Sequence, residues 1–278
     1  MDYQNNISIL PFFYDLKFQH HRKSYVYGQF HPTSSIIRQL PPFQFIDTYT
    51  SSNNNLIATI RRLSDNSTHD ITAAIELKLY TDYRIIICQG GTDIDSSAWW
   101  QTGKHQVEIA LGDVVGSPIV YSEIFCLKSD LSDQIKCEYW NNQNMAIPNG
   151  HIIYNSGFRH KIYVDSILGK PRYTYEETAQ NRNGRKFIIH QISKKVFRFS
   201  FLATESQIDA WRLVQLHDNI EITYQGILYK VDNISMSVEW LENGDLANID
   251  IEFETNTVAT SPNASDATEI TTGTDGYD

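Results

Sequence analysis

The first half of the chain alternates apolar and polar residues in short segments, the pattern of half-buried β-strands. The clearest segments are residues 56–60, 75–79, 85–88, 107–111 and 119–121, with a further signal at Cys126. Turn-rich sequences such as SSNNN, SDNST and QGGTDIDSS separate them. Their number and spacing predict an immunoglobulin- or fibronectin-like β-sandwich over residues 35–135, in which two sheets each bury one face.

The second half combines strand patterns with one helix. Residues 158–164 alternate as Phe158, His160, Ile162 and Val164, and residues 187–202 predict a long strand. Thr204 and Gln207 then form a T-x-x-Q capping box, which starts helices by satisfying free backbone N–H groups. Apolar residues recur at three- and four-residue spacing after it, so we predict a capped helix at about 204–217 that packs on a sheet.

Turn residues predict two hairpins after this helix. One turns at Gln225-Gly226, where glycine can adopt positive φ. The other joins residues 234–240 to residues 246–253 through an Asn-Gly turn. Residues 171–185, which carry Glu176 and Glu177 among several basic residues, are predicted to form an exposed loop.

The predicted fold class is mainly β with one packed helix, between all-β and α+β. A segment rich in Asn, Asp, Gly and Ser at residues 128–157 places a domain boundary near residue 135. Residues 1–34 are either an aromatic-rich N-terminal arm that packs on another subunit or the first strands of the sandwich. Residues 136–258 form a β-rich assembly domain. Residues 259–278 form a polar tail that cannot bury enough apolar area to fold alone, although a partner could order it.

Composition and charge narrow the functional classes. The 278 residues are 41% hydrophobic and carry a formal net charge of −10, which works against nucleic acid as the main partner and against anionic lipid. No run approaches the roughly 18 apolar residues of a membrane span, and the N-terminus lacks the pattern of a signal peptide. The three cysteines contain no CxxC pair and are expected to be thiols in a reducing cytoplasm.

No sequence motif predicts catalysis. Walker, GxGxxG, GxSxG and HExxH patterns are missing from the sequence, and the nine histidines are scattered apart from His20-His21. Asp93 to Ser97 gather carboxylates and hydroxyls that hard cations favour, but lack the glycine and distant glutamate of a calcium-binding loop. We therefore predict no catalytic, cofactor-binding or metal-binding residues, no cofactor, and a protein that is not an enzyme.

Two groups of residues are candidates for interaction. Glu239, Asp250, Glu252 and Glu254 lie on the outward face of the last two strands. This is either a solvated face or an interface that meets basic residues of a neighbouring copy. The basic candidates are Lys161, Lys170, Arg172, Arg182, Arg185 and Lys186.

Aromatic residues form the second group. Trp99 and Trp100, with Tyr139 and Trp140, offer an aromatic platform for a sugar or a partner chain, against the simpler interpretation that they pack in the core.

The runs KVFRFSFLATESQIDAWRLVQLHDNIEIT and VEWLENGDLANIDIEFETNTV resemble structural proteins from the tail gene clusters of tailed phages and prophages of gut Bacteroidales, including the crAss-like group. The resemblance covers about residues 150–258, and LPPFQF and YSEIFCL extend it faintly into the first half. It implies a tail, collar or baseplate subunit of the virion, made in the host cytoplasm and without an active site. The implied partners are copies of itself in a homo-oligomeric ring and other virion tail proteins.

Two other classes of function stay open on the sequence. The chain could be a carbohydrate-binding module at a tail tip that uses Trp99 and Trp100. It could also be a carbohydrate-active enzyme, which would need two opposed carboxylates in a concave site.

Overall fold

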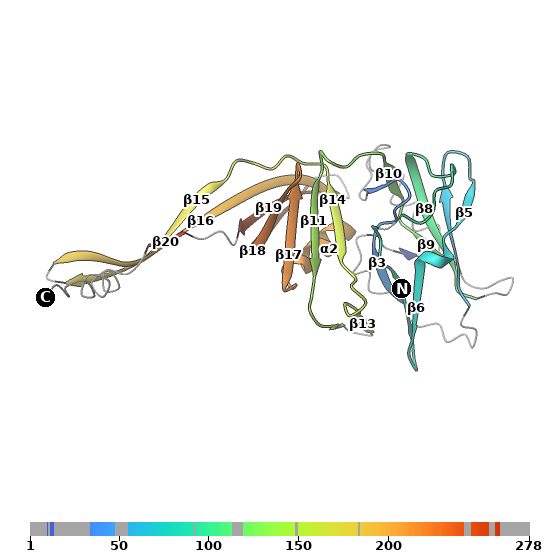
Figure 1. The fold of residues 1–278 in the computed structure, drawn as a ribbon, viewed down its shortest axis with the longest axis horizontal. Coiled ribbons are helices and arrows are strands. Elements are labelled where there is room, and N and C mark those ends of the chain that lie inside the picture. Colours follow the sequence, from blue (N-terminus) through green and yellow to red (C-terminus); the bar gives the residue numbers. More distant parts are fainter. Residues whose placement is uncertain are drawn as a thin grey trace, which may run out of the picture.

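A computed structural model of the chain describes residues 10, 12–13, 34–47, 55–91, 93–112, 119–147, 150–182, 184–241, 246–255 and 259–261. The described structure is 57% strand and 6% helix, so the predicted mainly β fold with one helix is confirmed. The strands form two bodies joined end to end, and a long β-hairpin projects from the second body (Figure 1).

Two sheets face each other in the first body. The larger has the order β1-β9-β8-β10-β2, with β4 paired to β8 and β5 to β4. Its strands are β1 (Phe12–Phe13), β2 (Ser34–Ile36), β4 (Ile57–Arg62), β5 (Thr68–Asp70), β8 (Gly103–Ala110), β9 (Ile119–Ser122) and β10 (Phe125–Lys128). The smaller has the order β3-β7-β6, from β3 (Phe43–Asp47), β7 (Arg84–Cys88) and β6 (Ile75–Leu79), which follows the 3₁₀ turn η1 (Thr72–Ala74).

The two sheets share one apolar core. Phe43, Phe45 and Ile86 of the smaller sheet pack in the same cluster as Ile60 and Val107 of the larger. Strands such as β4 and β9 bury alternate residues, which explains why the alternation identified them, whereas β3 and β7 bury all five of their residues. Phe12 of β1 belongs to this core and stacks on Phe45 with ring centroids 4.6 Å apart. The arm predicted within residues 1–34 otherwise lies almost wholly outside the described residues.

A single curled sheet builds the second body, in the order β14-β11-β17-β18-β19-β16-β15, with β20 (Ala259–Ser261) beside β16. Its strands are β11 (Ile135–Trp140), β14 (His160–Val164), β15 (Arg172–Arg182), β16 (Arg185–Thr204), β17 (Asn219–Tyr224), β18 (Ile227–Trp240) and β19 (Leu246–Thr255). Residues 165–171 connect β14 to β15 and run along β16, where Gly169 N–H donates to Arg198 C=O at 2.9 Å. The sheet therefore nearly closes on itself.

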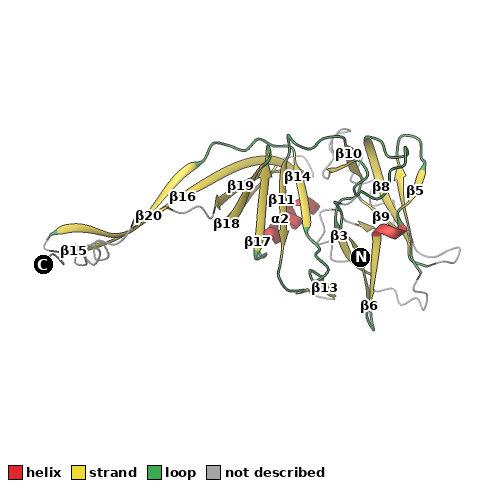
Figure 2. Ribbon diagram, in the orientation of Figure 1, coloured by secondary structure: helices red, strands yellow, loops and turns green. Residues whose placement is uncertain are grey.

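Helix α2 (Glu205–Val214) covers the core of this curled sheet (Figure 2). Both hydrogen bonds of the predicted capping box are present, between Thr204 and Gln207, so the predicted start is confirmed. Trp211 is 1% exposed and packs its ring 5.4 Å from Phe201. At ten residues α2 is too short to span a bilayer, and no other helix in the described part of the chain could do so.

Both predicted hairpins form. Gln225 and Gly226 have φ of 49° and 77° between β17 and β18, so both turn residues adopt positive φ. Strands β18 and β19 pair from Val231 opposite Thr255 to Trp240 opposite Ala247, while turn residues 242–245 lie outside the described residues.

The predicted loop at residues 171–185 is wrong, because most of it is strand β15. Strand β15 pairs with β16 from Arg172 opposite Val196 to Arg182 opposite Arg185. Strand β19 reaches β16 only as far as Val196. Residues 172–195, called the arm below, are therefore a two-stranded ribbon (Figure 1), and β20 is the one described strand beside it, paired with Gln191–Ser193. The predicted tail thus begins with a short strand, and its remaining residues lie outside the described residues.

A third apolar cluster joins the two bodies. Ile46, Ile85 and Ile87 of the smaller sheet pack with Ile152 of β13 (Gly150–Ile152), which pairs with β12 (Met145–Ile147), and with Ile153, Tyr154 and Phe158 of the segment that follows. The Gln44 side chain adds two hydrogen bonds: it donates to Ile153 C=O at 2.8 Å and accepts from Ile153 N–H at 3.0 Å. The junction is therefore packed and hydrogen-bonded.

Candidate functional site

The predicted acidic face lies on the outer side of strands β16 and β19. Phe253, Ile251 and Ile249 point into the core, so the alternating residues Asp250, Glu252 and Glu254 point outward. Each of these carboxylates meets a cation of the same chain. Arg198 lies 2.9 Å from Asp250, Arg172 2.6 Å from Glu252, and Lys194 3.2 Å from Glu254.

These contacts form a charge ladder across the base of the arm. Ser200 also donates a hydrogen bond to Asp250, and this bond together with Arg198 lowers the pKa of the Asp250 carboxyl. Exposed ion pairs of this kind contribute little to stability, typically below about 1 kcal/mol. The ladder therefore joins the base of the arm to strand β19, and it adds little to the stability of the fold.

The remaining predicted interface residues are distributed over the molecule. Glu239 is exposed on β18, opposite Asn248. Arg182 and Arg185 are paired in the backbone register at the far end of the arm, and Lys186 is exposed beside them. Lys161 lies in the body, 3.4 Å from Glu138. The structure thus gives Asp250, Glu252 and Glu254 partners within the chain, and contact with a neighbouring copy stays a prediction.

Trp99 and Trp100 contact each other and residues of the same chain. Their rings cross at 88° with centroids 5.3 Å apart, and Trp100 is only 6% exposed. His69 stacks on Trp99 at 5.1 Å, and Arg62 lies 5.4 Å from the same ring. The Trp99 indole N–H donates to Ser67 Oγ at 3.0 Å. Two crossed rings, one of them buried, do not form a flat two-ring platform.

Asp95 organises the loop beside these tryptophans. It accepts hydrogen bonds from Ser97 N–H and Trp100 Nε1–H, both at 2.8 Å, and lies 2.5 Å from His69 Nε2. The backbone N–H of Ser97 is the main cause of the lowered pKa of the Asp95 carboxyl. Within the described ranges, no three His, Cys, Asp or Glu side chains are grouped to hold a metal ion. Asp95 acts here as a hydrogen-bond acceptor that orders its own loop.

A buried cluster of two tyrosines and two histidines lies where β11, β14 and the end of α2 meet. His217 Nδ1 lies 2.7 Å from Leu213 C=O, which assigns the proton to Nδ1 and makes Nε2 the acceptor for Tyr154 O–H at 2.5 Å. His160 Nε2 then donates to the Tyr154 oxygen at 3.2 Å. The Tyr139 ring stacks on His160 with centroids 4.7 Å apart.

Burial keeps both histidines of this cluster neutral. It lowers the pKa of His160 to about 3, and it also lowers the pKa of His217. His160 Nδ1 and Tyr139 O–H have no hydrogen-bond partner among the described residues. No sequence motif marks this cluster, although His160 stands in the same alternation as buried Phe158 and Ile162. That position was the available signal for an inward-facing histidine.

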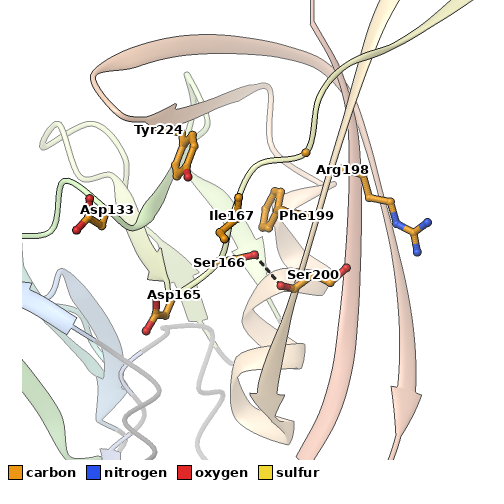
Figure 3. Close-up of a pocket in the computed structure, with 9 residues that line it drawn as sticks. Asp133, Asp165, Ser166, Ile167, Arg198, Phe199, Ser200 and Tyr224 are labelled. Carbon is orange, nitrogen blue, oxygen red and sulfur yellow. Dashed lines mark hydrogen bonds between the residues drawn. The ribbon is translucent and has the colours of Figure 1, made fainter.

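One open cavity lies between the β14–β15 connection and strand β16 (Figure 3). Its volume is about 870 Å³, and Asp133, Asp165, Ile167 and Tyr224 are among its lining residues. Arg198 points away from it, toward the charge ladder. Ile167 is 79% exposed at its rim. The lining includes the exposed Asp133 and Asp165, and the cavity is open to solvent, as a surface depression is.

The cysteines are thiols in this structure. Cys88 and Cys137 are buried and Cys126 is partly buried, and none forms a disulfide. Burial raises the pKa of the Cys88 thiol to about 12 and raises that of Cys137 as well. Protonated buried thiols are poor nucleophiles, so these two side chains serve packing.

A scan against models of known protein families finds no match for this chain, and a search of curated proteins finds no significant match either.

Proposed function

We propose that the chain is a non-enzymatic structural subunit of a tailed-phage virion, located in the tail, collar or baseplate, and that it assembles with copies of itself and with other tail proteins. The observation that carries the proposal is the arm. It is a ribbon of two long strands that projects from a packed body (Figure 1).

The length of the arm supports a role in assembly. Eleven residues of β15 at about 3.3 Å each extend about 36 Å along the ribbon. An isolated two-stranded ribbon is at best marginally stable in water. Two large side chains of this ribbon are also open to solvent, since Tyr173 is 54% exposed and Tyr175 is 64% exposed. Exposed aromatic residues on a projecting ribbon suit contact with a partner.

Charge is divided unevenly between the arm and the rest of the chain. The arm contains six Lys or Arg residues and two Glu, a formal charge of +4. The rest of the chain contains 17 basic and 31 acidic residues, a formal charge of −14. A basic projection on an acidic body favours attraction between copies, in which the arm of one approaches the body of another.

The proposal is tested by the mass of the purified protein in solution and by electron microscopy of the same sample. We expect multimers, and closed rings among them. In a truncated variant, residues 176–192 are replaced by Asn-Gly, which keeps Tyr175 opposite Ser193 in a tight hairpin. We expect this variant to keep the circular dichroism spectrum of a folded body and to lose assembly.

A matched control keeps the arm and removes charge at its far end. Arg182→Gln, Arg185→Gln and Lys186→Gln together should weaken assembly less than the truncation at low salt, and should lower its sensitivity to salt. A wild-type protein that stays monomeric alone and with the other tail proteins would contradict the proposal. An unchanged multimer in the truncated variant would remove the arm as its basis.

A further inference from the structure

Strand β18 has an edge that no described strand covers. Strand β19 pairs with β18 from Val231 to Trp240 on one side. On the other side, β17 pairs only with Ile227–Lys230. Residues 234–240 therefore have a neighbouring strand on one side only within the described part of the chain. A strand in this position presents unpaired backbone N–H and C=O groups.

The sequence of this edge lacks the usual protection against pairing. Natural edge strands carry lysines, prolines or bulges that block a further strand. Residues 234–240 read ISMSVEW, with Glu239 as the one charge and no proline. The register irregularity of β18 lies before this segment, between Val231 and Asn233. The edge is thus regular and suited to accept another strand.

Apolar residues mark one end of the same edge. Trp240 is 52% exposed and the following Leu241 is 42% exposed. Exposed aromatic side chains beside a regular edge are the residues that anchor protein interfaces most often.

The arm provides a strand that fits. Strand β15 is last in the order of its sheet and pairs only with β16, so its outer edge is also open among the described residues. It carries exposed Tyr173 and Tyr175 and belongs to the +4 segment of an otherwise acidic chain. Within one molecule β19 and β16 lie between β18 and β15. A β15 strand that pairs with the β18 edge must therefore belong to another molecule.

We infer that residues 234–240 of β18 accept strand β15 of a second copy of this chain, so that one sheet continues across two molecules. This inference rests on the proposed function and names the surface that receives the arm. Backbone hydrogen bonds would join the two edges. Glu239 lies beside the approaching basic ribbon, and opposite charges favour that approach. Each copy has one donor strand and one acceptor edge, which is the head-to-tail arrangement that produces rings or filaments.

Paired charge variants of the edge test the inference. Ser235 and Ser237 are exposed on β18, so Ser235→Lys with Ser237→Lys should leave the fold intact, which the thermal unfolding midpoint checks. Lysines protect the edge and repel the basic arm, and we expect association at least about tenfold weaker by light scattering over a dilution series. The matched variant, Ser235→Glu with Ser237→Glu, should associate at least as well as the wild type.

Amide hydrogen exchange provides a readout specific to strand pairing. On association, we expect slower exchange in residues 234–240 and in residues 172–182. The truncated variant, in which Asn-Gly replaces residues 176–192, should lose this protection in residues 234–240.

Three outcomes would overturn the inference. Slow exchange, in the dilute monomer, of those amides of residues 234–240 that point away from β19 would mean that the same chain covers the edge. Unchanged association of the lysine variant, with loss of association in the truncated variant, would leave the proposed function standing and place the arm elsewhere. A wild type that never associates, alone or with the other tail proteins, would remove the proposed function as well.

Discussion

Stability should fall as the pH falls from about 7.5 to about 5 because of the buried His160. Its pKa is about 3 in the folded protein, against 6.5 for an ordinary histidine in the unfolded chain. The folded state keeps the ring neutral over this range, while the unfolded state binds a proton below about pH 6.5. The contribution of neutral His160 to the free energy of unfolding is therefore present above pH 6.5, and it is lost as the pH falls from 6.5 toward 3.

The expected size follows from these two values. At about pH 5 the unfolded chain gains a factor of about 30 in population from protonation of this one ring, while the folded chain gains almost nothing. The free energy of unfolding should fall by about 2 kcal/mol. His217, whose pKa burial also lowers, should add to the loss in the same direction.

Titration of the hydrogen-bonded aspartates contributes little to the change in stability over this range of pH. Hydrogen bonds lower the pKa of Asp65, Asp95 and Asp130 below the usual 3.8. Their contribution to stability is present above that value and is lost only as the pH falls below it. The change in the free energy of unfolding between about pH 5 and about pH 7.5 therefore comes mainly from histidines.

Urea unfolding at the two pH values, followed by tryptophan fluorescence, measures the effect. His160→Phe keeps an aromatic ring between Tyr139 and Phe158 and removes the titrating group, so it should lose the part of the pH dependence due to His160, about 2 kcal/mol, and keep the part due to His105 and His217. His151→Gln changes an exposed histidine and should retain it. If wild type and His160→Phe lose equal stability between the two pH values, the buried neutral histidine is not the cause.

Three further predictions concern packing and ion pairs, each read from urea unfolding at neutral pH. Trp211→Ala should cost about 3–5 kcal/mol, because it empties the site between α2 and Phe-rich strand β16; a loss below about 1 kcal/mol would contradict the packing. Arg84→Met leaves Asp47 buried without the guanidinium now 2.6 Å away and should cost about 3–5 kcal/mol, whereas adding Asp47→Leu should recover most of it. Arg172→Ala breaks an exposed pair with Glu252 and should cost less than about 1 kcal/mol, with a larger loss marking the charge ladder as structural.

The sequence predicted the elements whose local signals agree with their surroundings. The capping box at Thr204 and the glycine turn at Gly226 appear as expected, because each depends on a few neighbouring residues. Strands such as β4 and β9 were also recognisable, since they bury one face more than the other, whereas β3 and β7 are buried on both faces. Pairing between distant strands, such as β8 with β4, could not be derived from spacing alone.

Strand β15 was wrongly predicted to be a loop. Its charged residues, with Glu176 and Glu177 among several basic ones, indicated an exposed loop, whereas backbone pairing with β16 makes it a strand. The acidic residues of β19 have cations of the same chain beside them, Arg172, Lys194 and Arg198, and contact with a neighbouring copy stays a prediction. These cations lie far from β19 in sequence, so composition alone carries no record of the contacts.

The same limit applies to the aromatic residues. Trp99 and Trp100 are conspicuous in the sequence, yet Trp100 is buried and Trp99 is covered by His69. His160 is inconspicuous, yet it lies at the centre of a buried polar cluster. Burial of a single side chain depends on which strands curl over it, and that follows from the whole sheet.

The packed junction between the two bodies has a mechanical consequence. Gln44 binds Ile153 through both its donor and its acceptor, and the isoleucines around Ile46 and Ile152 close the same seam. A tether of loose chain would stretch when its ends were pulled apart. This seam instead resists shear, because sliding would break two hydrogen bonds and expose apolar surface at once. A force applied to the curled sheet would therefore be transmitted through this junction to the first body, and the two bodies would move together.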